Sequence, residues 1–222
     1  MEKTRTVLYD RDIREPLFDF LEERYGKIRV LEEKIIGGAR ADLIMITPGI
    51  LYGIEIKSDA DTYTRLKRQT EYYNRFFDRN ILVVGSTHGN HAAEHIPEWW
   101  GIITVEEDGD RVDFYVLREA GENPEVKPEN KITMLWRPEL ANILANNMLP
   151  AYKYKSKKFV QEYLINSIPG EKLWPQVCEE LFERDYNTIE EKIKEFRKEN
   201  SLRPRRKRRV KKAAVRRIKN TK

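Results

Sequence analysis

Apolar residues recur at helical spacing in some segments of the chain and alternate with polar residues in others. The segment 11–25 predicts a helix that ends at Gly26, with one apolar face made of Ile13, Leu17, Phe20 and Leu21. Strands are predicted at 28–36, on either side of Pro48-Gly49 within 41–59, and at 81–85, 101–106 and 111–117. Helices are predicted over 60–79 and around 90–96. The order α-β-β-β-α-β-α-β indicates an α/β fold with a mixed sheet.

The chain changes character after residue 121. Residues 122–130 carry two prolines and mixed charge, which predicts a linker. Beyond it, apolar residues at three- and four-residue spacing predict helices in 138–149, 156–168, 173–186 and 188–200, and Thr188 with Glu191 forms a capping box for the last one. We therefore expect an α/β domain over 1–121, a small helical domain over 131–200 and a disordered tail over 201–222.

The formal net charge of +5 conceals a strong asymmetry. Twelve Lys or Arg and no acid lie between Arg203 and Lys222, and removing them from the 42 basic residues leaves 30, against 37 acidic ones. Such a tail is typical of chains that bind a polyanion, usually nucleic acid, although a merely solubilising end is the alternative. Its candidate phosphate contacts are Arg205, Arg206, Lys207, Arg208 and Arg209.

The single cysteine, Cys178, excludes an internal disulfide framework and suits a reducing compartment. Its apolar neighbours in sequence predict a position in the core. The first residues lack the apolar stretch of a secretion signal, and no run of about 20 apolar residues could span a bilayer. We expect a soluble cytoplasmic protein with no membrane partner, and association with the nucleoid stays open.

Three charged residues interrupt the apolar strands of the hairpin over 41–59: Asp42, Glu55 and Lys57. Charges in half-buried strands must be paired or kept in contact with water. The Pro-Gly pair suits a type II turn, which would pair the flanking residues Thr47 and Ile50. In that register Asp42 faces Glu55 across the two strands, and Lys57 lies on the same side of the sheet.

The same register places Gly53 among these charges, where it would leave the surface open, and turns Ile54 and Ile56 toward the core. Two carboxylates directly opposite each other, with Cβ atoms roughly 4.5–5.5 Å apart, destabilise a sheet. A divalent cation between them would remove this conflict, and hard oxygen ligands suit Mg²⁺ or Mn²⁺. The alternative is a polar face on which Lys57 forms salt bridges with both acids.

The hairpin resembles the motif of the PD-(D/E)XK nuclease superfamily. The matching residues are Asp42 and, thirteen positions later, Glu55-Ile56-Lys57, behind an N-terminal helix; Ala41 stands where the motif often has proline. The next helix carries Gln69 and Tyr73 at the spacing of the QxxxY element of the RecB-like branch. Residues 10–120 also resemble a family of small bacterial and phage proteins of unknown function, and the helical region does so more loosely.

The resemblance implies a restriction-endonuclease-like fold over 1–121 and a metal-dependent nuclease. Asp42, Glu55 and the carbonyl of Ile56 would bind Mg²⁺ (or Mn²⁺), and Lys57 would orient or deprotonate a water molecule. It also implies roles for Gln69 and Tyr73 at the site. A further acid is expected on the first helix: Glu15 is the first choice, and Glu33 on the following strand is the competitor.

Several basic residues are candidates for contacts with nucleic acid. Asp61, Arg65, Gln69 and Tyr73 are spaced by four and form one helical stripe, so Arg65 could border the metal site. An Asp61–Arg65 surface pair is the alternative. Arg68 points elsewhere on the helix, where it would meet solvent or backbone phosphates. The segment 139–168, with a basic-aromatic loop between two helices, resembles a helix-extended-loop-helix DNA-binding pattern, although a plain helical subdomain is equally compatible. Its candidates for phosphate contacts are Lys153, Lys155, Lys157 and Lys158.

Two other motifs carry less weight. Residues 91–95 spell H-x-x-E-H, an inverted zinc-protease motif, but the required third ligand on a later helix is missing because the next segment predicts a strand. Trp99-Trp100 suits core packing better than base stacking.

The leading hypothesis is a Mg²⁺-dependent deoxyribonuclease acting on DNA, with RNA left open. The alternatives are a catalytically silent DNA-binding or repair-accessory protein and, more remotely, the zinc protease.

Overall fold

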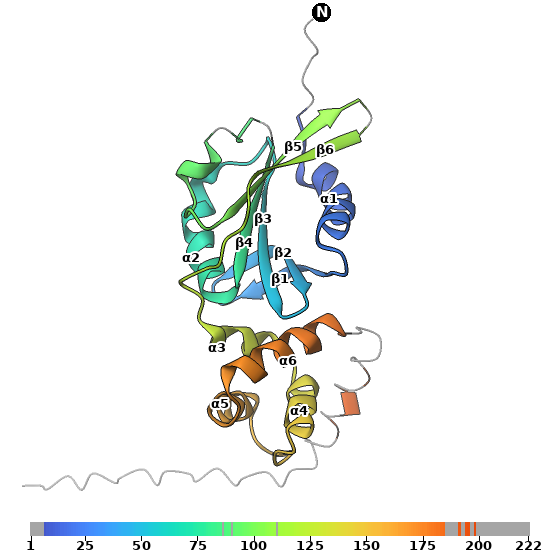
Figure 1. The fold of residues 1–222 in the computed structure, drawn as a ribbon, viewed down its shortest axis with the longest axis vertical. Coiled ribbons are helices and arrows are strands. Elements are labelled where there is room, and N and C mark those ends of the chain that lie inside the picture. Colours follow the sequence, from blue (N-terminus) through green and yellow to red (C-terminus); the bar gives the residue numbers. More distant parts are fainter. Residues whose placement is uncertain are drawn as a thin grey trace, which may run out of the picture.

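The computed structural model describes residues 7–184 except 86, 90 and 110, together with residues 191, 194, 195 and 198 (Figure 1). One six-stranded sheet forms the centre, with its strands in chain order from β1 to β6. The strands are β1 (Arg29–Ile36), β2 (Ala39–Thr47), β3 (Ile50–Lys57), β4 (Arg79–Gly85), β5 (Gly101–Asp108) and β6 (Arg111–Arg118). Pairs β3–β4 and β4–β5 are parallel and the other pairs are antiparallel, so the sheet is mixed.

The two faces of the sheet are covered by different helices (Figure 1). Helix α1 (Asp10–Tyr25) buries Ile13, Leu17 and Leu21 against one face, which includes Ile54 and Ile56 of β3. Helix α2 (Leu66–Phe76) and the 3₁₀ turn η1 (Tyr63–Arg65) that precedes it cover the other face. Because successive strand residues alternate between faces, Glu55 and Lys57 share one face, opposite Ile54 and Ile56, as predicted, and this face is the one covered by α2.

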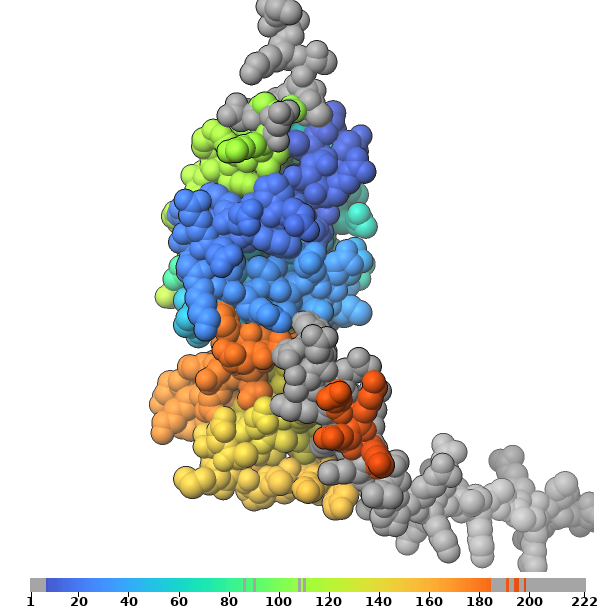
Figure 2. Space-filling model, turned by 90° about the vertical axis from the view of Figure 1, so that its right-hand side faces the viewer, coloured from blue at the N-terminus to red at the C-terminus, as the bar shows by residue number. Residues whose placement is uncertain are grey.

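The helices beyond the sheet extend the core on the α2 side. They are α3 (Pro128–Lys131), η3 (Ile132–Met134), α4 (Arg137–Asn146), α5 (Lys157–Ser167) and α6 (Gly170–Phe182). One continuous apolar cluster joins Leu51 of β3 to Val177 and Leu181 of α6. Figure 2 shows these helices (yellow to orange) directly against the strands (blue). The helical region therefore shares its hydrophobic core with the sheet, and burial of this common surface stabilises both.

The segment between the sheet and α3 is tied to α2. The buried Asn123 side chain donates to the carbonyls of Asn74 and Phe77, each at 2.7 Å. Asn74 in turn donates to Glu125 at 2.9 Å. The stretch predicted as a linker is thus held by side-chain hydrogen bonds that replace regular secondary structure.

The α/β class with a mixed sheet is confirmed, and two sequence predictions need correction. The helix predicted over 60–79 covers only 63–76, because Ser58 and Asp61 form a hydrogen-bonded turn before it. The helix predicted around 90–96 is a single 3₁₀ turn, η2 (Ala92–Glu94). Its three residues are too short to place His91 and His95 on one helical face. The helix over 188–200, its capping box and the tail over 201–222 lie outside the continuously described residues.

Two further features concern the remaining predictions. No helix in the described part of the chain is both long and apolar enough to cross a membrane. Cys178 is buried in the α6 core, and burial raises the pKa of its thiol to about 12. A thiol with this pKa stays protonated at neutral pH, so it acts as a core side chain and not as a nucleophile.

Candidate active site

The site forms where β2 and β3 separate. The predicted register holds from the Thr47–Ile50 pair to the Leu43–Ile54 pair. The β2–β3 ladder ends there, while β3 continues along β4 as far as Lys57 and Val84. Asp42 and Glu55, the next residues in this register, flank the gap. The Asp42 carboxylate accepts a hydrogen bond from the backbone N–H of Ile56 at 3.0 Å, so a side chain takes the place of a ladder bond.

The hydroxyl of Tyr73 lies in this gap and contacts both strands. It accepts from the backbone N–H of Asp42 at 3.1 Å and lies 2.7 Å from Glu55 Oε2, to which it donates. Burial raises the pKa of Tyr73 well above its ordinary value, with the charges of Glu55 and Asp42 acting in the same direction. The hydroxyl therefore stays protonated and orients both acidic residues at once.

Gly53 makes this position of Tyr73 possible. A Cβ atom at Gly53 would overlap ring atoms of Phe77 and Tyr73, so the missing side chain lets both rings approach the strand. We predicted that Gly53 would leave an open surface beside the charges. The opposite is found, because aromatic rings from the end of α2 fill the space above the glycine.

Glu55, Lys57 and Gln69 form a buried polar cluster on the α2 side. Lys57 Nζ lies 2.6 Å from Glu55 Oε1, with side-chain exposures of only 7% and 1%. Gln69 donates to the same carboxylate oxygen and accepts from Lys57 at 3.2 Å. Buried charges are tolerated when they are paired and hydrogen-bonded in this way. The structure therefore places Gln69 in contact with Glu55 and Lys57.

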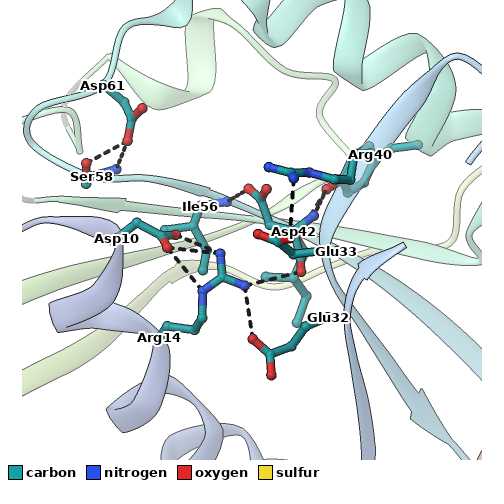
Figure 3. Close-up of polar contacts among 11 residues, drawn as sticks. Asp10, Arg14, Glu32, Glu33, Arg40, Asp42, Ile56, Ser58 and Asp61 are labelled. Atoms are coloured by element: carbon teal, nitrogen blue, oxygen red, sulfur yellow. Dashed lines mark hydrogen bonds and ion pairs between the residues drawn. The ribbon is translucent and has the colours of Figure 1, made fainter. Parts of the chain in front are cut away.

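These groups line a pocket of about 410 Å³ that opens beside the end of β3. Figure 3 shows how α1, β1, β2 and β3 converge on it. The pocket is strongly polar, with acidic and basic side chains in equal number. Its lining residues are Asp10, Arg14, Glu33, Gly38, Ala39, Arg40, Asp42, Glu55, Ile56, Lys57, Asp61, Arg65, Arg68 and Gln69.

The structure distinguishes between the candidates for a further acid. Glu15 is exposed on α1 and does not line the pocket. Glu33 does line it, and it has a backbone φ of +50° at the position opposite Asp42 on β1. Asp10, which the sequence analysis missed, also lines the pocket from the first turn of α1. The sequence pattern started this helix at residue 11, one residue after Asp10. A helix start placed at Asp10 would have been the only sequence signal for this acid.

Three arginines stand on the rim of the pocket. Arg65 and Arg68 come from the η1–α2 segment, as candidates for phosphate contacts, and Arg40 of β2 adds a third that was not predicted. Asp61 does not form the alternative pair with Arg65; it accepts hydrogen bonds from Ser58. Arg68 was expected to point elsewhere, but it borders the pocket and donates to the Gly38 carbonyl at 3.3 Å.

Of the remaining basic candidates, the two that the structure describes, Lys157 and Lys158, lie away from the pocket. Lys157 donates to the Thr133 carbonyl at 2.9 Å, and Lys158 lies 3.7 Å from Glu162 within α5. Burial lowers the pKa of Lys157. The tail candidates Arg205, Arg206, Lys207, Arg208 and Arg209 fall outside the described residues.

The histidine motif is not arranged around a metal. His91 pairs with Glu94 at 2.9 Å on the surface, whereas the rings of His88 and His95 pack against Tyr63. Among the described residues, no three His, Cys, Asp or Glu side chains are grouped to hold an ion. Trp100 is fully buried and donates to Asn74 at 2.7 Å, in keeping with its predicted core position.

The electrostatics of the gap are dominated by the two carboxylates. Burial, followed by the charge of Glu55, raises the pKa of Asp42 from its ordinary value of 3.8 to about 7, against the opposing effects of the Ile56 amide and Lys57. Asp42, Glu55 and the Ile56 backbone are all hard oxygen donors that reach one pocket. Mg²⁺ and Mn²⁺ bind such donors and keep several water ligands, so two carboxylates and a carbonyl fit either ion.

Comparison with known proteins adds a family. The sequence profile of the family described as Bacteriophage P4 protein cII matches residues 3–211, which is nearly the whole chain. The chain belongs to this phage P4 cII family. No curated protein and no solved structure matches this cII-family chain. The family therefore connects the chain with phage, and its description carries no information about the chemistry of the pocket.

The raised pKa of Asp42 predicts how Asp42→Asn changes stability. Below pH 4, Asp42 is protonated in both the folded and the unfolded state, so its raised pKa does not affect stability. Between pH 4 and about 7 the unfolded chain loses this proton more readily than the folded protein does, so the free energy of unfolding falls as the pH rises. In EDTA, Asn at this position should raise the melting temperature by several degrees at pH 8 and hardly at pH 4. Thermal unfolding of both proteins, with Glu15→Gln as an exposed control, measures this difference. A shift that is the same at both pH values would contradict it.

The position of the Tyr73 hydroxyl predicts a second effect. Tyr73→Phe leaves the Asp42 N–H and Glu55 Oε2 without their buried partner, which should lower the free energy of unfolding by about 1–3 kcal/mol. Tyr72→Phe, at the preceding position of α2, is the matched control and should change this free energy by less than about 0.5 kcal/mol. Urea unfolding tests both. Equal effects of the two substitutions would show that the hydroxyl in the gap is unimportant.

Proposed function

We propose that this cII-family protein is a metal-dependent nuclease that hydrolyses phosphodiester bonds in DNA, with a restriction-endonuclease-like core in its α/β part. The observation that carries the proposal is the meeting of Asp42, Glu55 and Lys57 in one pocket at the point where two strands separate. These residues also form the sequence motif that resembles the PD-(D/E)XK superfamily. The pocket thus supports the proposal by geometry as well as by sequence.

Each residue of the pocket has a chemical task in this proposal. Asp42, Glu55 and the Ile56 carbonyl would hold Mg²⁺ or Mn²⁺, which would make a bound water more acidic and stabilise negative charge on the phosphate. Lys57 now neutralises Glu55, so the amine and the cation compete for the same carboxylate. Once released, the Lys57 ammonium group would orient the attacking water and stabilise the hydroxide that forms when this water loses its proton to solvent. Gln69 and Tyr73 hold Glu55 in place during this exchange.

The rim arginines account for binding of the substrate. Arg40, Arg65 and Arg68 surround the acidic centre and would contact the phosphates on either side of the scissile bond. Such contacts place the backbone without reading the base sequence. The cationic tail would add further phosphate contacts and increase the salt dependence of binding.

Cleavage assays with Mg²⁺ and Mn²⁺ test the proposed reaction on single-stranded, duplex, flap and junction DNA and on RNA. The wild-type protein should cleave at least one DNA substrate. Asp42→Ala, Glu55→Ala and Lys57→Ala should each reduce cleavage by 100-fold or more while DNA binding persists. Glu15→Ala, which removes an acid outside the pocket, should retain activity. Unimpaired cleavage by Glu55→Ala would reject the assigned site.

One observation favours the alternative of a catalytically silent DNA-binding protein. Both oxygens of Glu55 are already engaged, by Lys57 and Gln69 on one side and by Tyr73 on the other. If Lys57, Gln69 and Tyr73 do not release Glu55, these hydrogen bonds keep the carboxylate engaged and no ion binds there. Wild-type protein that binds DNA but shows neither metal binding nor cleavage would establish this alternative.

A second cationic surface lies in the loop between α4 and α5. Lys153, Tyr154 and Lys155 are exposed there, and the buried Arg137 donates to the carbonyls of Ala151 and Tyr152, at 3.3 and 2.8 Å, which fixes the loop from beneath. The amine of Lys157 is bonded to the Thr133 carbonyl. Lys153 and Lys155 are therefore better candidates for phosphate contacts than Lys157. Aromatic and basic residues side by side suit binding to nucleic acid.

Lys153→Glu should therefore weaken binding to duplex DNA severalfold at low salt. If Lys153 neutralises one phosphate, the slope of log K against log salt should also fall by about 0.9. Lys172→Glu, an exposed lysine on α6, is the control of equal charge change and should have a smaller effect. A salt titration by fluorescence anisotropy gives both quantities. Equal losses in the two variants would assign the effect to net charge alone.

A further inference from the structure

Asp42 lies at a defect in the sheet where neither neighbouring strand pairs with it. On the β1 side the ladder runs through Glu32–Leu43 and Lys34–Ala41 but omits the position between them, Glu33 opposite Asp42. On the β3 side the ladder ends one residue before Asp42. Buried backbone groups require hydrogen-bond partners, so the two backbone groups of Asp42 must find them elsewhere.

Side chains from both faces of the sheet supply these partners. Tyr73, from α2 on one face, accepts from the N–H of Asp42. Arg14, from α1 on the opposite face, donates from NH1 to the Asp42 carbonyl at 3.4 Å. Together with the Ile56 N–H on its carboxylate, three groups of Asp42 are held by residues from three different elements.

Arg14 is itself fixed in a way that only an arginine allows (Figure 3). Its Nε and NH2 groups donate to Asp10 at 2.9–3.1 Å, and its NH1 lies 3.3 Å from Glu32 Oε2. Its side chain is only 17% exposed, although both acidic partners are about half exposed. The planar guanidinium thus spans two carboxylates and a carbonyl at fixed angles, which an ammonium group on a flexible stem does not reproduce.

We propose that Arg14 is a positioning residue for the metal site: it holds the Asp42 backbone from the far face of the sheet, so that the Asp42 carboxylate stays beside Glu55. This inference rests on the proposed function, because it concerns the same pair of carboxylates. Arg14 acts through Asp42 and does not itself ligate the cation.

The proposal makes a prediction that opposes simple electrostatics. Arg14 is a positive charge near the metal ligands, so removing the charge alone would tighten the binding of a divalent cation. Loss of the hydrogen bond by which Arg14 holds the Asp42 carbonyl would weaken cation binding instead. Residues that orient metal ligands typically contribute 10–100-fold to metal affinity. Arg14→Lys separates the two effects, since it keeps the charge and loses the planar fork.

Calorimetric titration with Mn²⁺, in the absence of DNA, measures the effect without requiring activity. Arg14→Lys and Arg14→Gln should each weaken Mn²⁺ binding about tenfold or more. Arg11→Gln, an exposed arginine on the same helix, should leave it unchanged. The amide resonance of Ile56 should shift in both Arg14 variants, because its partner Asp42 moves. Unchanged affinity in Arg14→Lys, or tighter binding in Arg14→Gln, would overturn the proposal.

The outcomes separate this inference from the proposed function. Wild-type protein that does not bind Mn²⁺, or binds it equally well as Asp42→Ala, would refute the metal site itself. Binding that depends on Asp42 but not on the arginine fork would refute only the role of Arg14. If Arg14→Gln fails to fold, Glu32→Gln provides the second variant, since it weakens the anchor of the guanidinium while Arg14 remains, and Glu32 does not line the pocket. It should weaken Mn²⁺ binding in the same direction, and full wild-type affinity there would count against the proposal.

Discussion

Two carboxylates in a gap that water reaches poorly are the constraint on which the arrangement of this protein depends. Asp42 and Glu55 would repel each other in any sheet, and burial increases the penalty of their charges. The raised pKa of Asp42 records this conflict directly. The groups around the gap, namely the Tyr73 hydroxyl, the Lys57 amine and the Ile56 N–H, each reduce it by a hydrogen bond or an opposite charge.

The gap itself follows from local features of the three strands. Glu33 adopts a left-handed backbone conformation opposite Asp42, which interrupts the β1–β2 ladder. Residues with side chains adopt this conformation rarely, and such strain tends to be found at functional sites. Gly53 then allows aromatic rings to approach β3 from above, so that Tyr73 can reach into the opening. The hydroxyl is accommodated because the backbone groups there have no strand partners.

The sequence predicted those parts of the site that depend on short-range geometry. A Pro-Gly turn and the two-residue period of strands were sufficient to give the register of the hairpin and the shared face of Asp42, Glu55 and Lys57. The positions of Asp10 and Arg14 were not accessible in this way, since they depend on how α1 crosses the sheet edge. The covering of Gly53 was mispredicted for the same reason: the rings that fill the space come from a helix twenty residues later in the chain.

The attachment of the helical region explains why the hairpin can be rigid at one end and open at the other. The turn between β2 and β3 packs beside Cys178 and Phe182 of α6, and Leu51 belongs to the core that continues into those helices. Arg29 of β1 donates to the Arg184 carbonyl at 2.6 Å just beyond α6, which fixes the neighbouring strand at the same end. With one end of the hairpin held by this packing, the strands can separate at the other end without losing register. The helical region is thus part of the structure that positions the acidic residues, whatever it also binds.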